Sequence, residues 1–149
     1  MLVKLVGLVL ASLALSASAA SAAVTVSVTE GELTVIGSSG RDTPWIDYVP
    51  SQDRTRVFNA DGVADPIPAE CERPLAGQDP APNGIPQDPS DVALCGPGGS
   101  ATFLGDLVLD LGDGNDEPDV NECFNTVIID LGEGNNSAEG SPCNNGVFG

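Results

Sequence analysis

Two consecutive twenty-residue segments near the end of the chain share one pattern. Residues 106–125 read DLVLDLGDGNDEPDVNECFN, and residues 126–145 read TVIIDLGEGNNSAEGSPCNN. A fixed period of this length indicates stacked units rather than a globule in which each segment occurs once. Each unit is an apolar, β-branched run followed by a Gly-rich acidic turn. The pattern predicts an all-β chain that ends in a short parallel β-roll or β-solenoid of about two to three coils.

The segment before the repeats predicts further strands. Residues 24–36 alternate β-branched and polar side chains around Glu30 and Gly31, which is typical of two strands joined by a tight turn. Residues 45–49 and 55–58 predict two more strands. The only tryptophan, Trp45, is expected to fill the core or to cover an end of the solenoid, because aromatic side chains bury so much area.

Proline-rich residues 64–100 predict a long loop without regular ladders, because proline blocks both helices and central strands. The sequence therefore divides into four segments: a signal peptide at 1–22, a β-rich head at 23–63, a disulfide-tied proline-rich loop at 64–100, and the repeats at 101–149.

The first 22 residues have the pattern of a secretory signal peptide. Lys4 precedes an apolar stretch at 5–15, and small residues in Ala-x-Ala spacing follow. The apolar stretch is too short to span a membrane, and no later segment approaches that length. We therefore expect a secreted or cell-surface protein without a membrane span.

The chain is strongly acidic, with 22 Asp and Glu against five Lys and Arg and a net charge of −17. Loss of Lys4 with the signal peptide would leave four arginines as the only cations. This balance disfavours nucleic acid and anionic membranes as partners and favours divalent cations. A solvated, highly soluble surface accounts for much of the charge without any ligand.

Four cysteines in an exported chain indicate two disulfides. Cys123 and Cys143 occupy the same position in successive units, and adjacent coils lie about 4.8 Å apart, a separation that a disulfide spans. We predict this pair, and by elimination Cys71 with Cys95. A zinc site is the competing interpretation, but the chain has no histidine and no closely spaced cysteine pair.

The Gly-rich turns predict a calcium site. Glycine allows the backbone to direct carbonyls toward one point, and a carboxylate two residues after the second glycine adds a charged oxygen. Calcium takes six to eight hard oxygen ligands, more than one turn offers, so two stacked turns would have to share the ion. The predicted ligands are Gly112, Gly114, Asp116, Gly132, Gly134 and Asn136. Asparagines in these turns could also stack as ladders that need no ligand.

An EF-hand does not fit these residues. If its loop began at Asp113, the glycine position would fall on Pro118 and the bidentate glutamate position on Phe124. Catalysis is not expected either. Without histidine there is no ordinary Ser/His or Cys/His pair, and carboxylates on solvated turns lack the apolar pocket that acid catalysis needs.

The turn 112–116, followed by Val120, resembles the G-G-x-G-x-D-x-U-x nonapeptide of the RTX, or haemolysin-type, calcium-binding repeats. Leu33–Thr43, the turn 61–63 and the first cysteine pair are similar to secreted actinobacterial members of that group. The resemblance implies ions held between successive turns by carbonyls and Asp, and repeats that become ordered when calcium binds. The chain departs from the pattern where Leu111 and Leu131 replace the first glycine and where Asn136 replaces the second Asp.

The sequence thus predicts a secreted calcium-binding repeat protein with a structural or adhesive role, and weak affinity, about 10⁻⁴–10⁻³ M, because charged ligands are few. The alternative is a metal-independent, disulfide-stapled solenoid that mediates protein contacts. Its last strand, near Val147 and Phe148, would then offer an open edge for another protein or a second copy.

Overall fold

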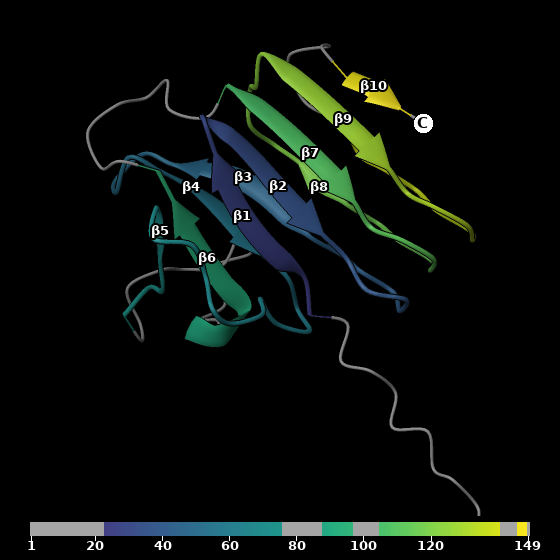
Figure 1. Ribbon diagram of the computed structural model, residues 1–149, viewed down its shortest axis with the longest axis horizontal. Helices are drawn as coiled ribbons and strands as arrows, with labels where there is room; N and C mark the ends of the chain where they lie inside the picture. Colours follow the sequence, from purple (N-terminus) through teal and green to yellow (C-terminus); the bar gives the residue numbers. More distant parts are fainter. Residues whose placement is uncertain (1–22, 76–87, 97–104, 141–145, 149) are drawn as a thin grey trace, which may run out of the picture.

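The described part of the chain consists of two five-stranded sheets that enclose one hydrophobic core (Figure 1). A computed structural model describes residues 23–75, 88–96, 105–140 and 146–148. The predicted signal peptide at 1–22 lies outside these residues. The first sheet has the order β1-β2-β7-β9-β10 and the second β5-β6-β4-β3-β8. The first contains β1 (Thr25–Thr29), β2 (Glu32–Ile36), β7 (Asp106–Asp110), β9 (Thr126–Asp130) and β10 (Gly146–Phe148). The second contains β3 (Trp45–Val49), β4 (Arg54–Phe58), β5 (Cys71–Glu72), β6 (Val92–Cys95) and β8 (Asp119–Val120), and a 3-10 helix, η1 (Pro89–Asp91), precedes β6.

Parallel pairing dominates the first sheet. Strand β2 pairs with β7, β7 with β9, and β9 with β10, all parallel. Strands β7 and β9 are offset by twenty residues, as in Leu107 and Val127, whereas β10 is offset from β9 by nineteen, because Val147 pairs with Ile128. Leu33 therefore lies beside Leu107, and Leu107 beside Val127. The twenty-residue period of the sequence is the offset between β7 and β9. Strand β1 pairs antiparallel with β2 through the tight turn at Glu30 and Gly31, both with positive φ, as predicted.

Alternating side chains explain why these strands form and which way they face. In β2, β7 and β9 the second and fourth residues are buried, and their neighbours are half-buried or exposed. Two apolar columns therefore run across the inner face of the sheet. Burial of a leucine, isoleucine or valine contributes about 1.5–3 kcal/mol, so these columns supply much of the stability of the sheet. They consist of Leu33, Leu107 and Val127, and of Val35, Leu109 and Ile129.

The second sheet corrects one prediction. Residues 92–95, inside the segment predicted to lack ladders, form β6, whose four residues are all buried. It pairs antiparallel with β4 and with the short β5. The stretch Val92–Cys95 contains no proline, so a strand of four residues fits between the proline-rich runs. Residues 76–87, the densest part of the proline-rich segment, lie outside the described residues.

A further copy of the repeat lies in the predicted head. Strand β2 occupies the same register position as β7, and β3 begins where β8 begins, because Trp45 pairs with Asp119. The segment ELTVIGSSGRDTPWI (32–46) therefore aligns without gaps with DLVLDLGDGNDEPDV (106–120). Head and repeats thus share one sheet and one core. Chain between these two copies forms the antiparallel part of the second sheet.

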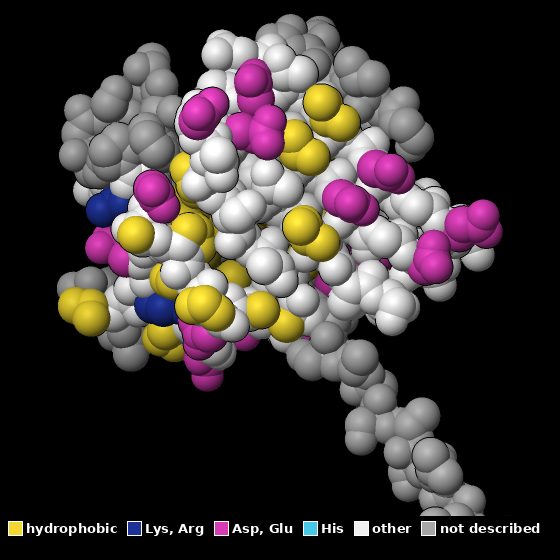
Figure 2. Space-filling view, viewed as in Figure 1, with side chains coloured by type: hydrophobic (Ala, Val, Ile, Leu, Met, Phe, Trp, Pro, Cys, Tyr) yellow, Lys and Arg dark blue, Asp and Glu magenta, His cyan; other side chains and the backbone are white. Residues whose placement is uncertain are grey.

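The all-β prediction is confirmed, although both sheets are mixed, and the predicted parallel β-roll stays a prediction. Within the described residues no helix has the length and apolar character needed to cross a membrane. Acidic side chains are spread over the face seen in Figure 2, and basic ones are few.

Candidate metal centre

Three turns follow β2, β7 and β9 and stack at one end of the first sheet (Figure 1). Backbone hydrogen bonds join each turn to the next. The N–H of Gly37 donates to the carbonyl of Asp110 at 2.7 Å, and the N–H of Gly114 donates to the carbonyl of Glu133 at 2.9 Å. The repeats therefore bring corresponding turn residues into register. The stacked turns comprise residues 37–42, 111–116 and 131–136.

Close approach of the turns explains two of their glycines. A Cβ on Gly114 would overlap the carbonyl oxygen of Gly40, and a Cβ on Gly134 would overlap that of Gly114. Any side chain at these positions would push the turns apart. The lack of space between the turns therefore requires glycine at these two positions whether or not the carbonyls bind an ion.

Three equivalent side chains form a column through the stack. The N–H of Asp42 donates to Asp116 Oδ1 at 2.8 Å, and the N–H of Asp116 donates to Asn136 Oδ1 at 2.9 Å. The side chains of Asp116 and Asn136 thus each accept a hydrogen bond from the backbone of the preceding copy. The residues in this column are 74 and 20 positions apart, the same offsets as those of the strands.

In the upper part of the column, formed by Asp42 and Asp116, two carboxylate oxygens have no partner among the described residues. Asp42 Oδ2 accepts hydrogen bonds from the N–H and hydroxyl of Ser38, at 2.7 and 3.2 Å. Asp42 Oδ1 and Asp116 Oδ2 are buried and have no hydrogen-bond partner among the described residues. Both aspartates have zero exposed surface. A buried carboxylate oxygen without a donor or cation is costly, so this arrangement lacks a positive partner.

The electrostatics of the pair agree with this geometry. Burial raises the pKa of Asp42, although the hydrogen bonds from Ser38 act in the opposite direction. Burial also raises the pKa of Asp116, and the negative charge of Asp42 adds to that rise. A buried carboxyl whose pKa is raised by burial and by a neighbouring carboxylate, as that of Asp116 is, is relieved either by a proton or by a cation.

In the lower part of the column, formed by Asp116 and Asn136, both polar atoms of the Asn136 amide have hydrogen-bond partners; we call this part closed. Asn136 uses its Oδ1 for the N–H of Asp116, and its Nδ2 donates to the carbonyls of Leu131 and Gly132 at 2.8 and 3.2 Å. Asn136 has an amide nitrogen, with two acceptors, where Asp42 and Asp116 each have a carboxylate oxygen without a partner. Nothing in the contacts of Asn136 calls for an ion.

The structure brings the six predicted ligands into two adjacent turns, in register. Of these, Asp116 has an unpartnered oxygen, and the amide of Asn136 is fully engaged. The close contacts of Gly132 and Gly134 with the carbonyls of the turn above show that these turns stack tightly. No group of three or more His, Cys, Asp or Glu within metal-binding reach of one another occurs in the described part of the chain. Any ion here would need backbone carbonyls or water among its ligands.

Sequence reasoning missed Asp42, which lies in the first turn, whereas the predicted ligands lie in the second and third turns. The missed signal is a spaced match: Gly40-x-Asp42-x-Pro44 corresponds to Gly114-x-Asp116-x-Pro118. Both prolines are buried. The search for a twenty-residue period could not find this copy, because its offset is 74 residues.

Residues that depart from the nonapeptide pattern fill the core. Leu111, in place of the first glycine, has no exposed surface, and Leu131 packs against the core. Ala138, at the apolar position after Asn136, also packs there. An asparagine ladder forms as well, because the N–H of Asn135 donates to Asn115 Oδ1 at 2.9 Å. These substitutions therefore support stacking of the turns without adding ion ligands.

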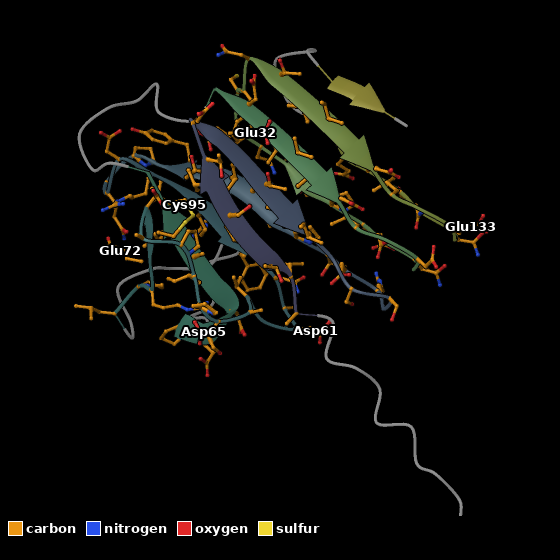
Figure 3. The ribbon with its side chains drawn as sticks, in the orientation of Figure 1. Glu32, Asp61, Asp65, Glu72, Cys95 and Glu133 are labelled. Atoms are coloured by element: carbon orange, nitrogen blue, oxygen red, sulfur yellow. A yellow bond between two sulfur atoms is a disulfide. The ribbon has the colours of Figure 1, made fainter. Side chains whose placement is uncertain are left out.

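The predicted disulfide between Cys71 and Cys95 is present and joins β5 to β6. In Figure 3, Cys95 lies in the second sheet, whereas Glu133 marks the tip of the turn after β9, so the disulfide is distant from the turn stack. Cys123 is also disulfide-bonded. Its predicted partner, Cys143, lies outside the described residues, so that pairing stays a prediction.

Comparisons with models of known protein families, with curated proteins and with solved structures gave no match.

Proposed function

We propose that the chain is an exported calcium-binding repeat protein with a structural or adhesive role. The ion would lie between the first two turns, where Asp42 and Asp116 supply the carboxylates. The observation that carries the proposal is the pair of unpartnered oxygens, Asp42 Oδ1 and Asp116 Oδ2, on side chains with no exposed surface. A divalent cation would neutralise both charges at once.

Calcium suits this donor set better than a transition metal. Only oxygens gather here: two carboxylates, with the carbonyl of Gly40 close to the carboxylate of Asp116 beside Gly114. Calcium takes carboxylates, carbonyls and water in flexible geometry, whereas zinc prefers cysteine and histidine. With two charged ligands, the affinity should lie in the weak extracellular range, about 10⁻⁴–10⁻³ M.

The ion would connect segments that are distant in sequence. Asp42 belongs to the first copy of the repeat and Asp116 to the second, 74 residues later. The parallel pairing of β2, β7, β9 and β10 and the stacked turns support the view that these copies are coils of one short β-solenoid. Calcium would then fix the first coil onto the rest, a structural role that matches the resemblance to haemolysin-type repeats.

The test is a calcium titration of the purified chain followed by circular dichroism and thermal unfolding. At about 100 times the dissociation constant, bound calcium should stabilise the fold by about 2.7 kcal/mol. Asp42→Asn and Asp116→Asn should each remove this effect. Asp113→Asn is the matched control, because Asp113 is exposed in the same turn as Asp116. A wild-type melting temperature that is unchanged by calcium at about 100 times the expected dissociation constant would refute the proposal.

A metal-independent solenoid that mediates protein contacts is the second candidate. The closed lower part of the column favours it, because Asn136 holds the second and third turns together without an ion. Among the described strands, β10 is at one edge of the first sheet, and a sheet edge can pair with another chain. Retained stability in chelator, together with concentration-dependent self-association, would favour this function.

A further inference from the structure

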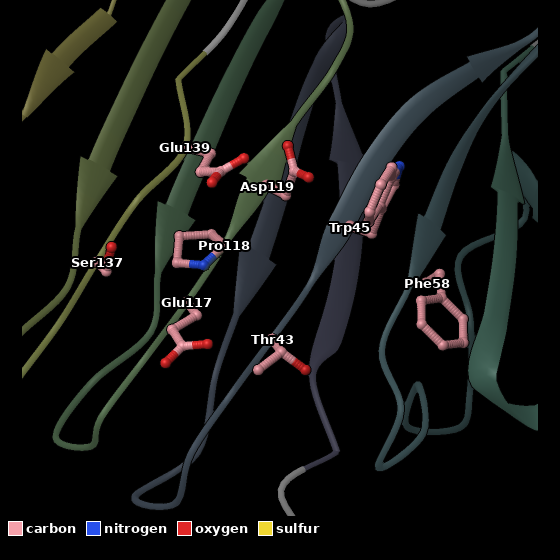
Figure 4. A pocket seen from close by; sticks show the side chains of 8 residues that line it. All are labelled: Thr43, Trp45, Phe58, Glu117, Pro118, Asp119, Ser137 and Glu139. Atoms are coloured by element: carbon pink, nitrogen blue, oxygen red, sulfur yellow. The ribbon is translucent and has the colours of Figure 1, made fainter. Parts of the chain in front are cut away.

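The outer face of the second sheet contains a cavity of about 570 Å³ that the calcium proposal does not use. One row of paired residues crosses its floor. Phe58 pairs with Trp45, Trp45 with Asp119, and Asp119 forms a bridge with Glu139. Figure 4 shows the carboxylates of Asp119 and Glu139 close together at one side and the two aromatic rings at the other.

The repeat itself builds this cavity. Trp45, Asp119 and Glu139 occupy equivalent positions in the three copies, and so do Thr43, Glu117 and Ser137 two residues earlier. Neighbouring strands lie about 4.8 Å apart, so equivalent side chains form even rows. Trp45 is half-buried, lies outside the buried core cluster and lines this cavity, so the prediction that it fills the core is wrong. The alternative, that it covers an end of the solenoid, stays a prediction.

Three acidic side chains, Glu117, Asp119 and Glu139, line the cavity, and one of them, Glu117, pairs with a cation. The ion pairs of the four arginines in the described residues are Arg41 with Glu117, Arg54 with Glu72, Arg56 with Asp47 and Arg73 with Asp65. Within the described residues, no ion pair involves Asp119 or Glu139. Burial raises the pKa of Asp119, and the charge of Glu139 raises it further.

We infer that this cavity binds a cationic side chain, arginine in preference to lysine, presented by a peptide segment of another protein. Asp119 and Glu139 would hold the charge, and the ring of Trp45 would pack against the planar group. Guanidinium groups pair with carboxylates and also stack on aromatic faces, a combination that suits this row. Arg41 already forms such a contact at the rim, 2.6 Å from Glu117. A saccharide would stack on the rings but would leave the paired carboxylates without a counter-charge.

The test uses a blocked tri-arginine peptide titrated into the full chain in the presence of calcium, with calorimetry for affinity. Fluorescence reports the location, because Trp45 is the only tryptophan. We expect saturable binding that changes the fluorescence of Trp45 and weakens with salt. A tri-lysine peptide should bind more weakly, and a tri-glutamine peptide should not bind.

The variant Asp119→Asn/Glu139→Gln should bind tri-arginine about tenfold more weakly. The control Glu70→Gln removes an exposed acid outside the cavity and should bind as wild type does. Circular dichroism verifies that each variant is folded. Equal weakening by the control would reduce the effect to overall charge and overturn the inference. Equal binding of tri-glutamine or of a neutral oligosaccharide, or no binding at all, would also overturn it. None of these outcomes depends on calcium binding at Asp42 and Asp116.

Discussion

At the two junctions of the turn stack, an aspartate and an asparagine occupy the equivalent acceptor position. Between the first and second turns, Asp116 accepts a backbone hydrogen bond through Oδ1 and leaves Oδ2 without a partner. Between the second and third turns, Asn136 accepts the equivalent bond, and its amide nitrogen donates to two carbonyls. Equivalent backbone hydrogen bonds support both junctions, from Glu117 to Asp42 and from Ser137 to Asp116. The bond from Gly114 to Glu133 belongs to the second junction alone among the described residues, because the N–H of Gly40 donates instead to Ser38 Oγ. The difference teaches that stacking needs no ion, whereas a carboxylate pair at a buried junction needs a positive partner.

The largest effect should come from breaking the stack on which both junctions depend. Gly114→Ala places a methyl group against the carbonyl of Gly40, and we expect destabilisation of about 3 kcal/mol or more in urea unfolding. The matched control is Gly105→Ala, where the nearest atom is a side-chain nitrogen of Asn125 at 3.3 Å. If both variants lose the same stability, close approach of the turns is not what requires glycine at 114.

The next largest effect should come from placing a carboxylate at Asn136, where the amide now has all its hydrogen-bond partners. Asn136→Asp removes the two donated hydrogen bonds and adds a charge near the carbonyls of Leu131 and Gly132. In chelator we expect a loss of about 1–3 kcal/mol in thermal or urea unfolding. Calcium should recover part of this loss, because a second carboxylate then faces Asp116. A loss of stability that is the same with and without calcium would contradict this expectation.

The converse change, Asp116→Asn, should raise the stability of the protein in chelator and lower it in calcium. Asp116→Asn keeps the acceptor for the N–H of Asp42 but removes the second buried charge. In chelator the variant should be more stable than wild type, by about 1 kcal/mol, whereas in calcium the wild type should be the more stable of the two. Melting temperatures with and without calcium measure both. A destabilised variant in chelator would mean that the charge of Asp116 has a partner in the apo protein.

These predictions also show how far the sequence could go. The twenty-residue period correctly gave the strands β7 and β9 and their register, because alternation and a repeated turn are local signals. The copy at 32–46 escaped the sequence analysis, because a segment that contains β4, β5 and β6 separates it from the next copy. The predicted site lies between the second and third turns, whereas the two unpartnered carboxylate oxygens belong to the first and second turns. Asp116 was identified, but its partner Asp42 becomes visible only when β2 is placed beside β7.

The smallest effect tests whether raised pKa values are specific to the turn stack. Glu122, beside β8, accepts a hydrogen bond from Thr55, and burial raises its pKa to about 7 from 4.5. Because the folded protein holds this proton more tightly, stability is fully present below about pH 4.5 and is lost as the pH rises through about 7.

Glu122→Gln should remove that part of the pH dependence. At neutral pH we expect a gain of about 1 kcal/mol, well below the full value of the shift, because solvent screens a partly exposed carboxyl. Thermal unfolding between pH 4 and pH 8 in chelator measures it, with Glu70→Gln as the control. A variant whose stability changes with pH as that of wild type does would show that Glu122 does not titrate in this range.

The most direct measurement is a crystal structure of the chain grown with calcium, or with a lanthanide as an anomalous scatterer. The account predicts one anomalous peak between the first and second turns, about 2.3–2.6 Å from Asp42 Oδ1 and Asp116 Oδ2, and no peak beside Asn136. An empty junction at saturating calcium, or a peak confined to the turns around Gly132 and Gly134, would contradict it.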